Sequence, residues 1–271
     1  MKKNKGKTAL VTGASGGIGY EIAKLFAADG INLVLIARRN DLLQKIKTEF
    51  EQQYGVAVQC IVMDLSAQGK GLELYGLCKE QHISIDYLVN NAGYGEYGKV
   101  ATGYSKAYDN MLNLNILTLT DLTTLFVRDM VGRGSGKIMN IASLAAFQST
   151  PMMAVYAASK SYVMHFTEAL HAELKGTGVT ATVLSPGVTK TGFVDRANMG
   201  VSAFAQGSQM DAARVAMAGY KGMLKGKLNV VPGLMNSILA FSTGITPSRR
   251  LLLTIAAYVM RVNKNYKTAQ A

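Results

Sequence analysis

The sequence predicts a single α/β domain in which a doubly wound parallel sheet of about seven strands carries helices on both faces. Short apolar runs rich in valine, isoleucine and leucine recur along the chain, as in strands that are buried on both sides. Stretches with apolar residues at helical spacing separate these runs, so strand and helix alternate. The chain has 271 residues, of which 49% are hydrophobic. That composition suits one domain with a substantial core.

The expected elements follow one another in a regular order. The predicted strands are Thr8–Thr12, Asn32–Ala37, Ala57–Met63, Tyr87–Asn90, Lys137–Ala142, Thr180–Ser185 and Lys227–Val231. After the first strand, Ile18, Ile22, Leu25 and Phe26 fall on one face of a predicted helix. We expect residues 1–232 to form the sheet domain and residues 233–271 to form a C-terminal helical extension.

The composition restricts the partners and the compartment. Lysine and arginine total 29 against 17 acidic residues, a net charge of +12 that favours anionic partners such as nucleotides or acidic lipid surfaces. No long run of like charge appears, and we expect no nucleic-acid partner. With only Cys60 and Cys78 present, neither a disulfide framework nor a metal site is indicated, which fits the cytoplasm. The basic N-terminus lacks the pattern of a secretory signal.

A glycine-rich turn follows the first predicted strand, with the sequence Thr12-Gly13-Ala14-Ser15-Gly16-Gly17-Ile18-Gly19. At the carboxyl end of a parallel strand, glycines let the backbone approach a pyrophosphate, and the N–H groups of the next helix face it. The alternative is a tight strand-to-helix connection without a ligand. The strand before the turn and the helix pattern after it favour a dinucleotide site.

A second motif has the residue types needed for proton transfer. Tyr156 and Lys160 are four residues apart in a predicted helix, so both side chains point to the same side. A free phenol has a pKa near 10, and a neighbouring ammonium is expected to lower the pKa of Tyr156 toward the neutral range. A tyrosine and a lysine at this spacing also occur by chance on helix surfaces. Ser143, at the end of the fifth strand, favours the catalytic interpretation.

These motifs resemble those of the short-chain dehydrogenases/reductases, a family with a Rossmann-type fold. Thr12, Gly13, Gly17 and Gly19 match the family's Thr-Gly-x-x-x-Gly-x-Gly, and the run that begins at Asn90 matches its Asn-Asn-Ala-Gly. The resemblance covers about residues 7–232. It is similar to the bacterial branch that contains NADP-dependent ketoacyl reductases and hydroxysteroid dehydrogenase-like proteins.

The resemblance implies a catalytic set and a cofactor site, with no metal. Tyr156 would be the general acid/base, Ser143 would hydrogen-bond the substrate oxygen, and Lys160 would also bind the nicotinamide ribose. Asn115 would hold a water that links Lys160 to solvent. The residues implied to bind the cofactor are Gly13, Ser15, Gly17, Ile18, Gly19, Arg38, Arg39, Asp64, Asn91, Ala92, Gly93, Tyr156, Lys160, Pro186, Gly187, Val188, Thr189 and Thr191.

Some of these assignments leave alternatives open. Asp64 would hold the adenine amino group, but a helix cap or turn residue is equally consistent with its position. Asn90 is expected to make a structural hydrogen bond between strands. Val188, Thr189 and Thr191 are alternatives for the contact with the nicotinamide carboxamide.

The end of the second strand predicts NADP(H) rather than NAD(H). NAD-specific proteins of this fold place a carboxylate there, which binds both ribose hydroxyls and repels a phosphate. This chain has Ala37 at that position, followed by Arg38, whose guanidinium can pair with a 2′-phosphate. Arg39 either assists or faces solvent, and Ser15 is not the basic residue that some NADP-using relatives carry.

The predicted activity is therefore interconversion of a carbonyl and an alcohol on a hydrophobic substrate. The side chains expected around the substrate are Leu144, Phe147, Met152, Met153, Phe193, Met199, Phe204 and Met210. A non-catalytic dinucleotide sensor, or a scaffold that binds a membrane or a partner, is the alternative, and the presence of Asn115, Ser143, Tyr156 and Lys160 argues against it.

Assembly and the role of the extension are separate expectations. The family resemblance implies a homodimer or homotetramer. The apolar stretches 238–241 and 251–260 are shorter than the roughly 18 to 20 residues that span a bilayer, so no transmembrane segment is expected. Their apolar faces, next to Arg249 and Arg250, predict helices that pack on the substrate pocket, a second subunit or a membrane surface.

Overall fold

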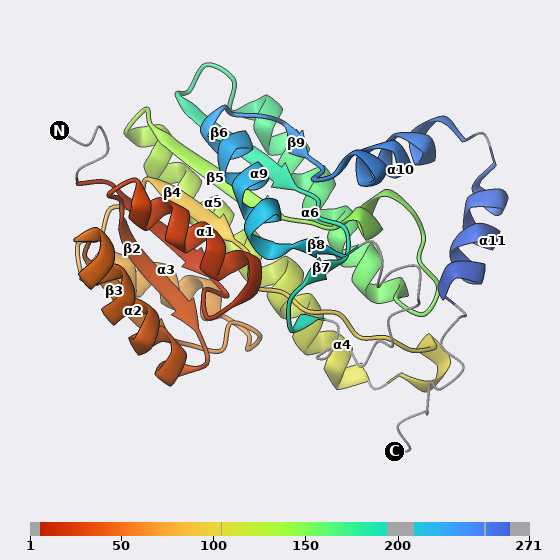
Figure 1. Ribbon diagram of the computed structural model, residues 1–271, viewed down its shortest axis with the longest axis horizontal. Helices are drawn as coiled ribbons and strands as arrows, with labels where there is room; N and C mark the ends of the chain where they lie inside the picture. Colours follow the sequence, from red (N-terminus) through yellow and green to blue (C-terminus); the bar gives the residue numbers. More distant parts are fainter. Residues whose placement is uncertain (1–5, 104, 194–208, 247, 261–271) are drawn as a thin grey trace.

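A parallel sheet forms the centre of the computed structural model. Within residues 6–103, 105–193, 209–246 and 248–260, which the structure describes, seven strands pair in the order β3-β2-β1-β4-β5-β6-β9 (Figure 1). The strands are β1 (Thr8–Thr12), β2 (Asn32–Ala37), β3 (Val58–Val62), β4 (Tyr87–Asn90), β5 (Gly136–Ile141), β6 (Val179–Leu184) and β9 (Asn229–Val230). The predicted doubly wound sheet is confirmed, because every pairing is parallel.

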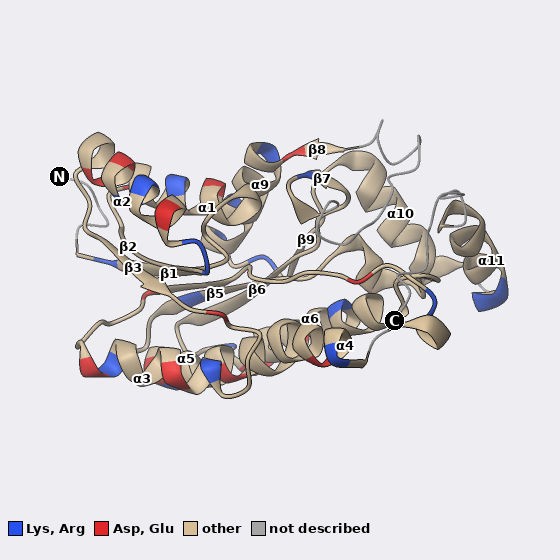
Figure 2. Cartoon of the chain, turned by 90° about the horizontal axis from the view of Figure 1, so that it is seen from below, with Lys and Arg blue, Asp and Glu red and all other residues tan. Residues whose placement is uncertain are grey.

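Helices cover both faces of this sheet, as predicted (Figure 2). One layer contains α1 (Gly17–Ala28), α2 (Asn40–Tyr54) and α9 (Ala212–Leu224), whose apolar side chains form one core cluster with the strands. The other layer contains α3 (Lys70–Glu80), α4 (Ser105–Leu112), α5 (Leu119–Gly132) and α6 (Ala154–Glu173), which bury most of a second cluster. Strands that are buried on both faces explain the continuous apolar runs in the sequence.

The strand order reverses at β1, which pairs with β2 on one side and with β4 on the other. Chain connections leave this point in opposite directions, so the loops after β1 and β4 separate and leave a crevice at the carboxyl edge of the sheet. The glycine turn follows β1 and Asn91 follows β4. The topology therefore places both motifs at the edge where ligands bind in open parallel sheets.

The segment between β4 and β5 contains an irregular helix. A π-helical turn, Asn113–Thr118, joins α4 to α5 and contains the buried Asn115. Single π turns inside helices rotate one side chain relative to the regular helix and are frequent at functional sites. Here the turn directs Asn115 toward the loop after β4, where it contacts Tyr94.

Smaller elements complete the carboxyl edge. Two short 3₁₀ turns are η1 (Val100–Thr102) and η3 (Leu144–Phe147), and β7 (Thr189–Lys190) pairs with β8 (Met210–Asp211). Two C-terminal helices, α10 (Leu234–Ile245) and α11 (Arg249–Met260), lie at the end of the molecule remote from β3 (Figure 1). Among the described residues, no helix has the length and apolar character needed to cross a membrane.

Candidate active site

The glycine turn is shaped by steric exclusion of side chains. Gly13 and Gly17 have φ values of +66° and +56°, in the left-handed region that disfavours side chains. At Gly19, a Cβ atom would lie 2.5 Å from the carbonyl oxygen of Gly13 and from Nδ2 of Asn91. The first turn of α1 therefore packs directly against the end of β1, and the N–H groups at its start are directed to the carboxyl edge.

Hydrogen bonds join this turn to the end of β4. The Thr12 hydroxyl accepts from the backbone N–H groups of Asn91 and Ala92 at 3.0 and 2.9 Å. The Asn91 amide donates to the carbonyl oxygens of Thr12 and Gly13 at 2.9 and 3.2 Å. Asn90 instead points into the core, where its amide donates to Thr123 and Asn140, so its expected structural role is confirmed.

The end of β2 brings two guanidinium groups to the same edge. Arg39 donates to the carbonyl oxygen and the hydroxyl of Ser15 at 3.2 and 3.0 Å, which places its guanidinium against the glycine turn. Arg38 lies 3.7 Å from the Asp64 carboxylate, and both side chains are about half exposed. Asp64 also accepts from the N–H and hydroxyl of Ser66, so its turn-forming role is present.

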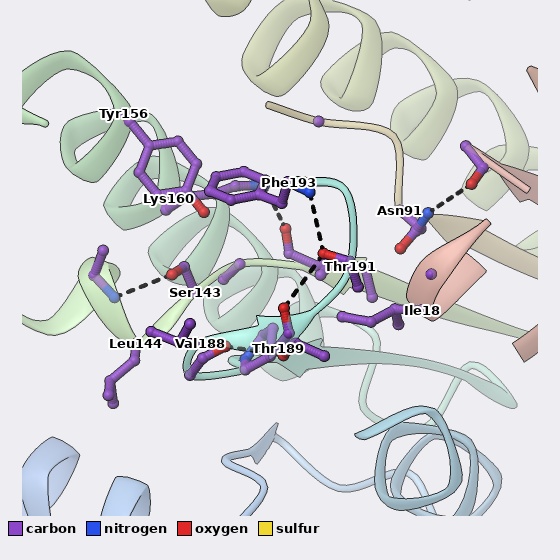
Figure 3. Close-up of a pocket in the computed structure, with 18 of the residues that line it drawn as sticks. Ile18, Asn91, Ser143, Leu144, Tyr156, Lys160, Val188, Thr189, Thr191 and Phe193 are labelled. Atoms are coloured by element: carbon purple, nitrogen blue, oxygen red, sulfur yellow. Dashed lines mark hydrogen bonds between the residues drawn. The ribbon is translucent and has the colours of Figure 1, made fainter. Parts of the chain in front are cut away.

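The candidate catalytic side chains come from β5 and α6. Tyr156 and Lys160 are both buried on one side of α6, and Ser143 follows β5 opposite them (Figure 3). The Lys160 ammonium donates to the carbonyl oxygen of Ile141 at 2.8 Å and lies 5.9 Å from the centre of the Tyr156 ring. The Phe193 ring packs 5.4 Å from the Tyr156 ring, measured between centroids.

Burial determines the protonation of this pair. Desolvation raises the pKa of Tyr156 to about 12, and a hydrogen bond with Ser143 opposes part of that rise. Desolvation lowers the pKa of Lys160 to about 8. The expected lowering of the Tyr156 pKa by Lys160 is therefore wrong for this structure. The ammonium is directed at the Ile141 carbonyl, so loss of water around the phenol outweighs its attraction.

Asn115 is hydrogen-bonded next to Tyr156 and Lys160. Its amide donates to the Tyr94 carbonyl oxygen at 3.0 Å and to the Ser159 hydroxyl at 3.1 Å, and its oxygen accepts from the Tyr94 N–H. Ser159, which precedes Lys160, had no predicted role. Its position three residues after Tyr156, on the same side of the helix, was the available signal. The water proposed beside Asn115 stays a prediction.

The segment after β6 closes the other side of the site. The Thr191 side chain packs against Gly17, where a Cβ atom would lie 2.9 Å from the Thr191 methyl group. Thr189 donates to the Gly187 carbonyl oxygen at 3.0 Å, and Thr191 accepts from the Phe193 N–H at 3.3 Å (Figure 3). The choice between Val188, Thr189 and Thr191 for a carboxamide contact stays open, since all three line the cavity.

One cavity of about 1030 Å³ unites most of the predicted site residues. The predicted catalytic and cofactor residues that line it are Gly13, Ser15, Gly17, Ile18, Arg38, Arg39, Asn91, Ala92, Gly93, Ser143, Tyr156, Lys160, Pro186, Gly187, Val188, Thr189 and Thr191. The predicted residues Gly19, Asp64 and Asn115 do not line the cavity themselves but lie next to residues that do. Gly19 packs against Gly13 and Asn91, Asp64 pairs with Arg38, and Asn115 lies next to Gly93.

Part of the cavity lining is apolar. Of the side chains expected around the substrate, Leu144, Met153, Phe193 and Met210 line the cavity. Phe147 and Met152 pack in the core clusters instead, and Met199 and Phe204 lie outside the described residues.

The C-terminal helices also line the cavity, through residues that the sequence did not predict individually. Leu239 of α10 and Val259 and Met260 of α11 reach the cavity. The Tyr97 hydroxyl donates to the Met260 carbonyl oxygen at 2.8 Å, which joins the end of α11 to the loop after β4. The helices of the extension therefore contact the cavity, and the predicted packing on a second subunit or a membrane surface stays a prediction.

A comparison with known families identifies the group to which this architecture belongs. Residues 7–201 match the short chain dehydrogenase family. The chain belongs to that family. Members of that family are oxidoreductases that bind NAD(P) and act on small molecules.

Similar proteins include the predicted branch. The chain is 36% identical over 187 residues to a very-long-chain 3-oxoacyl-CoA reductase of Anas platyrhynchos, an alignment that covers 67% of this chain and 59% of that one. The aligned part thus spans about six tenths of that relative. Ketoacyl reductase HetN of Nostoc is 36% identical over 189 residues, with 69% of this chain and 66% of the relative covered.

Solved structures of similar shape extend over nearly the whole chain. A short-chain dehydrogenase from Sphingobium yanoikuyae in complex with NADPH has a TM-score of 0.80 and 27% identity, with 98% of each chain covered. A bulky-bulky ketone specific alcohol dehydrogenase from Comamonas testosteroni has a TM-score of 0.74 and 27% identity, with 98% of this chain and 96% of that chain covered.

Proposed function

We propose that this short-chain dehydrogenase interconverts a carbonyl and an alcohol on a hydrophobic substrate, with NADP(H) as cofactor and Tyr156 as general acid/base. The observation that carries the proposal is the meeting of Ser143, Tyr156 and Lys160 in the same cavity as the glycine turn. A phenol, a hydroxyl and an ammonium on one side of a dinucleotide cradle are the groups that a carbonyl oxygen requires when it gains or loses a proton.

The cavity fits a nicotinamide dinucleotide. The glycine turn excludes side chains where a pyrophosphate would approach, and the start of α1 directs N–H groups toward it. Ala92 and Gly93 would flank the middle of the dinucleotide, Lys160 its nicotinamide ribose, and the segment from Pro186 to Thr191 its nicotinamide. When bound, the cofactor supplies the hydride.

The protein itself would supply the proton and stabilise the charge that develops on the substrate oxygen. Because the pKa of Tyr156 is raised to about 12, its phenol is protonated at neutral pH and can donate to a carbonyl oxygen that gains charge. Ser143, opposite the phenol, would donate a second hydrogen bond to that oxygen. Asn115 would hold a water through which Lys160 restores the proton, since it hydrogen-bonds Tyr94 and Ser159 beside the ammonium.

The preference for NADP(H) rests on the end of β2. Ala37 supplies no carboxylate to repel a 2′-phosphate, and Arg38 and Arg39 both line the cavity next to it. Arg38 is joined to Asp64 only by a long, half-exposed ion pair, so its guanidinium is available to a stronger anionic partner. The NADPH named in the Sphingobium yanoikuyae structure supports the same preference.

The substrate class follows from the apolar end of the cavity. Leu144, Met153, Phe193 and Leu239 offer apolar and partly flexible side chains around the space beside Tyr156. The names of the relatives, an oxoacyl-CoA reductase and a bulky-ketone dehydrogenase, are consistent with a large apolar carbonyl compound.

A homodimer or homotetramer in the cytoplasm is also part of the proposal. Exposed apolar side chains along α5 and α6, such as Val131 and Tyr162, support association through these core helices. The free thiols of Cys60 and Cys78 support a reducing compartment. Light scattering coupled to gel filtration measures the assembly directly, and a monomeric mass would contradict it.

A panel of carbonyl compounds assayed with NADPH and NADH tests the function. Aliphatic ketones, ring ketones and 3-oxoacyl thioesters cover the substrate classes that fit an apolar cavity. We expect NADPH oxidation with at least one of them, and slower oxidation of NADH. Tight NADPH binding without turnover across the whole panel would favour a dinucleotide sensor instead.

A further inference from the structure

Helix α10 presents its apolar face to solvent. Leu234, Ile238, Phe241 and Ile245 lie at spacings of four, three and four residues, so they form one stripe along the helix. Their exposed fractions lie between 51% and 80%. An ordinary surface helix turns such a stripe toward the core.

The polar side of α10 faces the protein. The Asn236 amide donates to the Pro232 carbonyl oxygen at 2.8 Å and packs against Gly187, and the Ser237 hydroxyl donates to the Val231 carbonyl oxygen at 3.0 Å. Ala240 is buried on the same side. The orientation of the helix is thus held by specific contacts. The apolar stripe is exposed, and its first residue, Leu234, also lines the cavity.

Helix α11 repeats the arrangement. Leu251, Ile255 and Tyr258 form a second stripe, with exposed fractions of 53%, 53% and 76%. Arg249 and Arg250 are exposed at the start of this helix, where the helix dipole disfavours positive charge. Cations at that position therefore do not serve the stability of the helix.

The charged residues of the two helices have one sign. Residues 234–260, which contain α10 and α11, include Arg249 and Arg250 and no aspartate or glutamate. Figure 2 shows basic colour on α11 and no acidic colour on α10 or α11. Apolar stripes beside basic residues are the pattern of helices that lie in the interface of an anionic bilayer.

We propose that the outer face of α10 and α11 docks on an anionic lipid surface. This C-terminal apolar face consists of Leu234, Ile238, Phe241, Ile245, Leu251, Ile255 and Tyr258. A second copy fits less well, because a symmetric contact through this face would bring Arg249 and Arg250 of both copies together without acidic partners. Anionic headgroups supply the missing negative charge, and the acyl region covers the stripes.

Docking would also place the cavity beside the lipid. Leu239 and Val259, on the same two helices, line the cavity and remain partly exposed. An apolar carbonyl compound dissolved in the bilayer would then enter between the helices. This consequence rests on the proposed function, whereas docking itself does not.

Vesicle flotation with the full chain tests the docking. The vesicles are phosphatidylcholine alone, or phosphatidylcholine mixed with phosphatidylglycerol, and we expect flotation with the mixed vesicles that weakens as salt is added. The double substitution Ile238→Ser with Phe241→Ser should lower the apparent affinity by at least about tenfold. Arg249→Gln with Arg250→Gln should lower it by roughly thirtyfold.

Matched controls separate docking from folding and from nonspecific charge effects. Val62→Ser with Leu72→Ser removes comparably exposed apolar side chains from β3 and α3, away from the helices proposed to mediate association, and Lys45→Gln with Arg128→Gln removes two exposed cations from α2 and α5. Both controls should float like the wild type. Equal flotation of all variants, or no flotation of the wild type, would overturn the proposal. Loss of oligomeric mass in the Phe241 variant with unchanged flotation would assign the face to a second copy.

Discussion

Replacing Lys160 by methionine should stabilise the protein while it removes activity. The ammonium is buried, with 4% of the residue exposed, and it donates a hydrogen bond to the carbonyl oxygen of Ile141 at 2.8 Å. A pKa lowered from 10.5 to about 8 corresponds to about 3 kcal/mol that disfavours the charged form in the folded state. Methionine has similar length and no charge, so it removes this penalty.

The net gain is smaller because a hydrogen bond is lost. Removing the donor to Ile141 offsets about 1 kcal/mol, which leaves a gain of about 2 kcal/mol near neutral pH. For a domain of this size that gain raises the melting temperature by roughly 4 to 8 °C.

The stability advantage of the Lys160→Met variant should decrease as the pH rises. Below about pH 8 the lysine is charged in the folded and unfolded states, and the penalty is complete. As the pH rises from about 8 toward 10.5, the folded state loses the proton first and the penalty of the wild type shrinks. The advantage of the Lys160→Met variant should therefore be largest at about pH 6.5 and fall below about 1 kcal/mol at about pH 9.5.

Urea unfolding of both proteins at these two pH values measures the difference. Lys45→Met, at an exposed position on α2, is the matched control and should show neither a gain nor a pH dependence. A Lys160→Met variant that is less stable than the wild type at about pH 6.5, or a gain that does not change with pH, would refute the reasoning.

The remaining predictions concern the cofactor site and the core. Arg38→Ala should weaken NADPH binding by about 1.5 to 3 kcal/mol and leave NADH binding nearly unchanged, as measured by fluorescence titration. Equal losses of affinity for both cofactors would argue against a contact between Arg38 and the 2′-phosphate. Gly19→Ala should reduce NADPH affinity at least about tenfold because its Cβ atom has no space, whereas Gly76→Ala on the open side of α3 should be neutral or slightly stabilising. Asn140→Ala should lower the unfolding free energy by about 2 to 4 kcal/mol because three buried partners, Asn90, Thr123 and Thr167, lose a hydrogen bond, whereas the exposed Asn110→Ala should change it little; similar effects of the two substitutions in urea would contradict this.

The sequence was informative wherever the signal was local. The strands β1, β2 and β4 begin and end at the predicted residues, because each is an apolar run bounded by turn residues. The glycine turn and the pair formed by Tyr156 and Lys160 were found for the same reason. Their meeting in one cavity then follows from the parallel topology, which brings the carboxyl ends of the strands to one edge.

Features that depend on distant contacts could not be found in this way. The hydrogen bond between Tyr97 and Met260 joins residues that are 163 positions apart, so no local sequence pattern predicts it. The pKa of Tyr156 was expected to be lowered because Lys160 is near in sequence. Its direction depends on the burial of the phenol and on the Ile141 carbonyl that orients the ammonium, and both are tertiary properties.

The most direct test of the central claim is the activity of Tyr156→Phe compared with its NADPH affinity. Removing the phenol oxygen leaves the glycine turn and Lys160 in place, so NADPH should bind within about threefold of the wild type. Turnover of a carbonyl compound that the wild type reduces should fall by about 100- to 10,000-fold, the range that general acid catalysis contributes. Retention of most of the activity would show that Tyr156 does not supply the proton, and the proposed mechanism would be wrong.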